Sequence, residues 1–178
     1  MPTLPWNGQK IMIDNFALTL ARKNLENVTP LKSDCGRLCG GACCQPSTEE
    51  TQGMLLFPGE EALYAGLDGY RVLDCAEGKL LVCAGRCRRE ERPLSCRIFP
   101  LLPLLREDGI HVVMDRRGRA VCPLTHEGKS ALNPAFVEAV AEAGRVLAKD
   151  ETQAAFLRRL TREQDEWKRL ARTLGAER

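Results

Sequence analysis

Four of the nine cysteines of this chain, Cys35, Cys39, Cys43 and Cys44, fall within ten residues. This density constrains the fold more than any other feature, because thiols so close together serve disulfides, redox exchange or metal binding. Three glycines between them allow the backbone to turn tightly around a centre. The gaps of three residues lie within the range that zinc sites use. We interpret the stretch as half of a metal site, in which one of the adjacent thiols Cys43 and Cys44 serves or bridges to a second centre.

A second group of thiols supplies the other half of the site. Residues 78–83 predict a strand that leads into it, and a β-hairpin over residues 110–121, turning at Arg117 and Gly118, is expected to return Cys122 to the site. Cys75 lies outside both groups and is expected to be a free thiol. The predicted metal ligands are Cys35, Cys39, Cys43, Cys44, Cys83, Cys87, Cys96 and Cys122.

Size and composition favour a cytoplasmic metal protein. The 178 residues suit one domain, or a domain with an appended helical piece. No apolar run is long enough to span a membrane, and residues 1–9 lack the pattern of a secretory signal. In a reducing cytosol, thiols hold metal rather than disulfides. Eight thiolates around two zinc ions would turn the formal charge of +2 negative, so the basic balance does not indicate a nucleic-acid partner. Metal ions are the expected partners, and the sequence identifies no protein partner.

The remaining patterns predict an α+β fold, with an irregular, metal-organised cysteine core and short strands, plus a C-terminal helical hairpin or bundle. Residues 1–33 are expected to pack on the core, residues 34–125 to form the cysteine-cluster metal-binding domain, and residues 133–175 to form the helical region. Within the first segment, residues 15–25 suit a helix or a broken strand equally well. Trp6 and this apolar set are expected to pack on the cysteine core.

Capping patterns divide the C-terminal region into three predicted helices. The first starts at Asn133 and has an apolar stripe of Phe136, Val140, Ala143 and Leu147. Asp150 is expected to cap the second, and a capping box of Thr161 and Gln164 to start a third. The basic residues of this region alternate with acids, which indicates a solvated face rather than a nucleic-acid surface.

Several charged residues can be interpreted either structurally or functionally. For Glu60 and Glu61, stabilisation of a helix dipole is favoured over the role of a catalytic base, because both lie near the start of a predicted helix. His126 is a better spare ligand than His111, although a hydrogen-bonded surface position is expected for both. Neutralisation of thiolates is favoured over binding of an anionic substrate or nucleic acid for five arginines, namely Arg86, Arg88, Arg89, Arg92 and Arg97.

The cysteine motifs resemble those of a known family. Beside the first four thiols, the run Arg92-Pro93-x-x-Cys96-Arg97-x-Phe99-Pro100 and the pair Cys122-Pro123 are similar to the YkgJ-like cysteine-cluster family, which is described as zinc- or iron-chelating and named for a CxxCxxCC signature. The resemblance covers residues 34–125 and departs from the signature in its first two gaps, which are three residues long here. It implies ligand roles at the matching cysteines. A similar cluster in flagellin lysine methylases is linked to an iron–sulfur centre.

Three functions fit these patterns. The favoured one is a metal-binding protein whose clustered thiolates hold an iron–sulfur cluster or zinc, since all-cysteine ligation suits both. Iron–sulfur is preferred because adjacent cysteines and unequal spacings suit a cluster that presents several iron atoms. The alternatives are a methyl-transfer or redox enzyme with the cluster near its active site, and a metal chaperone or sensor. No dinucleotide, P-loop or nucleophile-elbow motif assigns a catalytic residue.

Overall fold

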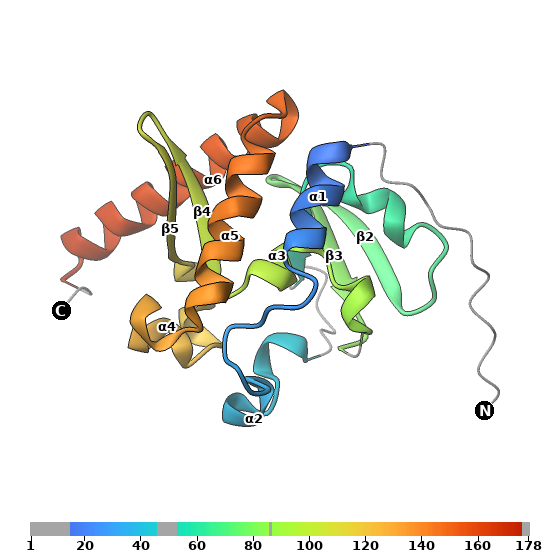
Figure 1. Cartoon of the computed structure of the whole chain (residues 1–178), viewed down its shortest axis with the longest axis horizontal. Coiled ribbons are helices and arrows are strands. Elements are labelled where there is room, and N and C mark those ends of the chain that lie inside the picture. Colours follow the sequence, from blue (N-terminus) through green and yellow to red (C-terminus); the bar gives the residue numbers. More distant parts are fainter. Residues whose placement is uncertain (1–14, 46–52, 86, 176–178) are drawn as a thin grey trace.

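The computed structural model describes residues 15–45, 53–85 and 87–175. Within these ranges, helices surround two small antiparallel sheets, which confirms the predicted α+β class (Figure 1). No helix in the described part of the chain is long and apolar enough to cross a membrane. Trp6 lies outside the described residues, so its predicted packing stays a prediction.

The first sheet has the strand order β1-β3-β2, with β1 at Met54–Leu55, β2 at Tyr70–Cys75 and β3 at Gly78–Cys83. Both pairings are antiparallel, and Tyr70 lies opposite Cys83. The strand predicted at residues 78–83 is therefore confirmed, whereas β2 was not predicted. Because β3 is the central strand, the sheet fixes the position at which Cys83 leaves it.

The second sheet is a hairpin of β4 (Leu101–Arg106) and β5 (Gly109–Met114). The hairpin predicted over residues 110–121 is wrong, because β5 pairs with the strand before it and the chain then forms a 3₁₀ helix, η4 (Arg116–Ala120). The Asp115 side chain caps this helix by accepting from the Arg117 amide. Cys122 lies two residues after the end of η4, and its amide donates to the Gly118 carbonyl at 2.8 Å.

The first described helix, α1 (Phe16–Asn24), settles the ambiguity of residues 15–25 in favour of a helix. The Asn15 side chain caps it by accepting from the Leu18 amide at 2.9 Å. Leu18, Ala21 and Leu25 are fully buried, whereas Phe16 is 81% exposed and does not belong to the apolar face. Helix α1 packs against α5, so the amino-terminal part of the described chain is held by the carboxyl-terminal helices (Figure 1).

The two long helices are α5 (Pro134–Leu147) and α6 (Glu151–Thr173). Their predicted caps are confirmed, since the Asn133 side chain accepts from Ala135 N and the Asp150 side chain accepts from Gln153 N. The third predicted helix is wrong: α6 runs on through residue 161, whose hydroxyl donates to the Leu157 carbonyl and accepts from the Leu105 amide of β4.

The helices do not form the predicted hairpin or bundle with each other. Helix α5 packs on both strands of the β4–β5 hairpin and on α1, whereas α6 packs on β4 (Figure 1). Gly144 brings α5 close to it, because a Cβ there would lie 2.8 Å from Pro103 Cβ and 2.9 Å from Ile110 Cγ2. The predicted apolar stripe of α5 is buried as expected, with Phe136, Val140 and Ala143 fully inaccessible.

One hydrophobic core joins the cysteine region to these helices. It contains buried residues of α1, α5, α6 and the β4–β5 hairpin, together with Leu94 and Ile98 of α3 (Leu94–Ile98) and the side chain of Cys122. Cys35 and Cys75 pack against it. The boundaries predicted at residues 34–125 and 133–175 stay a prediction, but the described parts of both segments depend on the same buried contacts.

Candidate functional site

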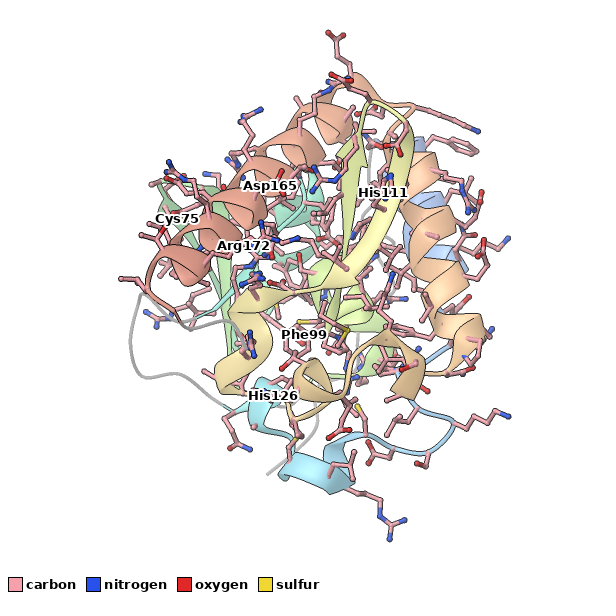
Figure 2. The ribbon with its side chains drawn as sticks, turned by 90° about the vertical axis from the view of Figure 1, so that its left-hand side faces the viewer. Cys75, Phe99, His111, His126, Asp165 and Arg172 are labelled. Atoms are coloured by element: carbon pink, nitrogen blue, oxygen red, sulfur yellow. The ribbon has the colours of Figure 1, made fainter. Side chains whose placement is uncertain are left out.

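All eight cysteines singled out from the sequence line one cavity of about 480 Å³. They come from five places in the chain: α2 (Gly36–Cys39) with the residue before it, the 3₁₀ helix η1 (Ala42–Cys44), the end of β3, the segment that includes α3, and the second residue after η4. The ninth cysteine, Cys75, ends β2 and does not line the cavity. Figure 2 shows Cys75 beside α6, whereas α2 lies at the lower end of the molecule.

Two glycines turn the chain between the thiols of the first group. Gly40 and Gly41 have φ values of 62° and 70°, a left-handed conformation that glycine adopts without steric cost. No atom would lie within 4 Å of a Cβ at either position, so backbone conformation rather than space requires glycine there. The reversal allows Cys39 and Cys43 to face the same cavity, as the sequence interpretation expected.

A buried carboxylate positions the helix that carries Cys96. Glu60 is fully buried at the start of η2 (Glu60–Tyr64), and its Oε1 accepts from the Leu94 amide at 2.7 Å and from Arg22 Nη1 at 2.5 Å. Its Oε2 accepts from the Phe57 amide at 3.3 Å. Burial raises the pKa of Glu60 even though Arg22 and the amides favour the ionised form. This structural role differs from the predicted helix-dipole effect, and Glu60 does not line the cavity.

The adjacent thiols Cys43 and Cys44 form a polarised pair. Their Sγ atoms lie 3.9 Å apart. The hydrogen bond from Cys43, assisted by the charge of Arg92, lowers the pKa of Cys44 to about 6, whereas the same bond raises the pKa of Cys43. Arg92 therefore favours a negative charge on Cys44 over one on Cys43.

Burial opposes ionisation of the other thiols whose pKa is shifted. It is the largest cause that raises the pKa of Cys35, Cys87, Cys96 and Cys122, and neighbouring thiols raise it further. A bound cation would relieve both effects, because metal ligation deprotonates a thiol. The cavity is therefore chemically suited to thiolates only when positive charge is present.

Arg92 supplies part of that charge. Although burial lowers the pKa of Arg92, the neighbouring thiols Cys44, Cys87 and Cys96 raise it overall. Its Nε is buried and has no hydrogen-bond partner among the described residues. Arg92 thus has the neutralising position that the sequence interpretation gave to five arginines.

Two of the other arginines hold the backbone instead. Arg89 donates to the carbonyls of Leu25, Glu26 and Val28. Arg97 donates to the carbonyls of Arg22, Arg89, Glu90 and Arg92. Both line the cavity, but these bonds tie the loops around it to α1 and α3. Arg88 is exposed and pairs with Glu91, with Nη2 at 2.5 Å from Oε1, and Arg86 lies outside the described residues.

Neither histidine lines the cavity. His111 Nε2 lies 2.8 Å from Asp108 Oδ1, and His126 Nε2 lies 3.1 Å from the Arg119 carbonyl oxygen. Both side chains are exposed, as Figure 2 also shows. The interpretation as hydrogen-bonded surface histidines is confirmed.

The thiols line the wall of the cavity without converging on one point. In the described part of the chain, no group of three or more cysteine, histidine, aspartate or glutamate side chains has the geometry to hold a single metal ion. The arrangement is therefore a shared thiol-lined space rather than a preformed tetrahedral site.

Comparisons of the chain with protein-family models, curated proteins and solved structures found no match. Its function is therefore argued from the chemistry of this cavity.

Proposed function

We propose that this protein binds metal through its eight cavity cysteines, as an iron–sulfur cluster or as zinc. The observation that carries the proposal is the segregation of the thiols: the eight line one cavity, and Cys75 does not. Nothing but metal, redox exchange or disulfide formation explains such a concentration of thiols, and all nine cysteines are free thiols in the structure. Thiolates are the ligands that zinc and iron–sulfur clusters prefer.

The size of the cavity fits a centre with more than one metal atom. Its volume of about 480 Å³ is many times the ~30 Å³ that one water molecule occupies in the liquid. Eight thiolates satisfy two tetrathiolate zinc ions or two four-cysteine clusters. We favour iron–sulfur, for the same reason as in the sequence interpretation, and the resemblance to the cysteine-cluster family supports ligand roles at the matching positions.

Cavity size also supports the enzyme alternative. Small-molecule pockets typically measure ~300–1,000 Å³, and this cavity falls within that range. Thr29, Asp34 and Phe99 line it together with the thiols. A methyl-transfer or redox enzyme with its substrate beside the cluster is therefore the second candidate. For the chaperone or sensor alternative, the supporting feature is the exposure of Cys43.

Metal analysis of anaerobically purified full-length protein tests the proposal. An iron–sulfur centre is expected to give a broad visible absorption with acid-labile sulfide, whereas zinc gives a colourless protein with at least two ions per chain. A single tetrahedral ion per chain would leave half of the thiols idle and favour the chaperone alternative. Protein that retains no metal after purification, and takes up neither zinc nor iron with sulfide, would refute metal binding.

A further inference from the structure

The chain between α1 and α2 forms one wall of the thiol cavity. We call this segment, residues 25–34, the strap. Its residues that line the cavity are Val28, Thr29, Pro30, Lys32, Ser33 and Asp34. Pro30 is buried, whereas the residues from Lys32 to Asp34 are exposed, so the strap runs from the inside of the cavity to its rim. The strap contains no helix or strand, and Cys35 directly follows it.

Arg89 holds the first part of the strap. Its Nε donates to the Glu26 carbonyl at 2.6 Å, and its Nη2 donates to the carbonyls of Leu25 at 3.0 Å and Val28 at 2.5 Å. A planar guanidinium presents its donors in a fixed fork, whereas a lysine concentrates its donors on one nitrogen. Three carbonyls of the strap are therefore fixed by one side chain from the segment between β3 and α3.

Arg89 is itself fixed in the structure. It begins the 3₁₀ helix η3 (Arg89–Glu91), and its carbonyl accepts from Arg97 Nη2 at 3.2 Å. The neighbouring Glu90 carbonyl accepts from Arg97 Nη2 at 3.0 Å and from Arg22 Nη2 at 3.1 Å. Arg22 pairs in turn with the buried Glu60. The residue that holds the strap therefore belongs to the same network that positions α3.

The rest of the strap has fewer attachments. The Pro30 carbonyl accepts from the Asn133 amide at 2.8 Å, where the strap passes the start of α5 (Figure 1). Beyond Pro30, the hydrogen bonds among the described residues are local, such as that from the Gly36 amide to Asp34 Oδ1 at 3.0 Å. Of the described hydrogen bonds that join the strap to segments other than α1 and α2, Arg89 donates three and Asn133 one.

We propose that the strap controls access to the thiol cavity and that Arg89 is the positioning residue that keeps it closed. Glu26 is exposed, so water can replace the guanidinium there and the strap can open without unfolding α1. Opening moves the rim away from Cys35 and admits metal ions or thiol reagents. This control of access rests on the proposed metal-binding function and deepens it, because opening then sets the rate at which metal enters and leaves.

Thiol labelling of the metal-free, full-length protein tests the strap without metal. Rates of N-ethylmaleimide labelling are measured by mass spectrometry at Cys35, which follows the strap, at the exposed Cys43, and at Cys75, which lies outside the cavity. In Arg89→Met, the rate at Cys35 is expected to rise about tenfold, because loss of hydrogen bonds from a charged donor favours local opening. The rates at Cys43 and Cys75 are expected to stay unchanged.

The comparison among these thiols separates opening of the strap from a general loss of stability. Equal acceleration at Cys35 and Cys75 would show that the whole core has loosened, and would overturn the proposal. An unchanged rate at Cys35 would overturn it too. The matched control is Arg145→Met, which removes an exposed arginine that donates to Glu138 and Glu142, and it is expected to leave all three rates unchanged.

A conservative variant separates lost hydrogen bonds from lost charge. Arg89→Lys keeps the positive charge near the thiols but cannot reproduce the fork of donors. Its labelling rate at Cys35 is expected to lie between those of the wild type and Arg89→Met. A lysine variant identical to the wild type would show that charge rather than fixation of the strap sets the rate, and would overturn the role given to the three carbonyl bonds.

Zinc-loaded protein provides the second readout. Release of zinc to excess chelator is expected to be faster in Arg89→Met by a factor similar to that for Cys35 labelling, with the same zinc content at saturation. Unchanged release despite faster labelling would show that metal leaves by another route, and would overturn the control of metal access. Wild-type protein that takes up neither zinc nor iron with sulfide would instead refute the proposed function, and the labelling test distinguishes the two failures because it needs no metal.

Discussion

Replacing Glu60 by glutamine is expected to destabilise the protein by about 3–5 kcal/mol, the usual cost of removing one partner of a buried ion pair. Glu60 is fully buried, and the side chain of its partner Arg22 is only 11% exposed. Without the carboxylate, the Arg22 guanidinium would keep its charge in a place where water cannot solvate it. The glutamine amide would also place a donor where the carboxylate accepts from the amides of Leu94 and Phe57.

The corresponding fall in melting temperature is about 6–20 °C, because 1 kcal/mol shifts the midpoint by roughly 2–4 °C in a chain of this size. Calorimetry or guanidinium unfolding of metal-matched, anaerobic samples measures it. The control is Glu61→Gln: Glu61 is half-buried and accepts from the Gly59 amide at 2.9 Å, a hydrogen bond that a glutamine oxygen can also accept. A Glu60→Gln variant within 1 kcal/mol of this control would refute the structural role of the buried carboxylate.

The pH dependence provides a second test of the same residue. Burial raises the pKa of Glu60 above its value of ~4.3 in the unfolded chain. Protonation of Glu60 therefore stabilises the folded protein relative to the unfolded chain. This stabilisation is complete below the unfolded pKa and is lost as pH rises through the folded pKa. The difference in unfolding free energy between wild type and Glu60→Gln is expected to shrink as pH increases from ~4 to 7. A difference that widens over this interval would contradict the raised pKa.

Three further predictions concern the thiol cavity. Cys122→Ser is expected to lose metal from one centre and to destabilise the core, whereas Cys75→Ser leaves the metal content unchanged; equal loss by elemental analysis would make Cys75 a ligand. Arg92→Gln is expected to weaken metal affinity about 10–100-fold, as for other residues that contact ligands, while Arg88→Gln has little effect in a chelator competition assay. In metal-free protein, the rate of Cys44 alkylation is expected to rise with pH through a midpoint of about 6, because its pKa is lowered; a midpoint near 9 would exclude the polarised pair.

The sequence by itself determined the features that depend on nearby residues. The side chains of Asn133 and Asp150 accept from backbone amides two and three residues further along the chain. Because this capping is local, the starts of both helices could be predicted from the sequence. The short apolar run within residues 78–83 predicted β3 with its correct bounds. The cysteine motifs selected the eight thiols that line the cavity, and Cys75, which lies outside those motifs, does not line it.

Tertiary structure decided whatever depends on residues far apart. The apolar strand β4, not the segment after Met114, pairs with β5, because its side chains are buried between the two long helices. Thr161 remains inside α6 because its hydroxyl bonds a carbonyl of its own helix and an amide of β4, so it does not start a new helix. Glu60 is an ion-pair partner rather than a helix-end charge because Arg22 of α1 folds onto it.

The grouping of the thiols shows the same limit. Spacing in the chain suggests that Cys35 to Cys44 act together, but the position of Cys122 depends on β5 and η4 and on the core around its side chain. Local rules describe side chains within a few residues of each other, whereas strand pairing, core packing and buried charge are set by contacts between segments whose encounter the sequence does not specify locally. The sequence therefore predicted which thiols line the cavity, but it did not predict which residues lie beside each thiol there.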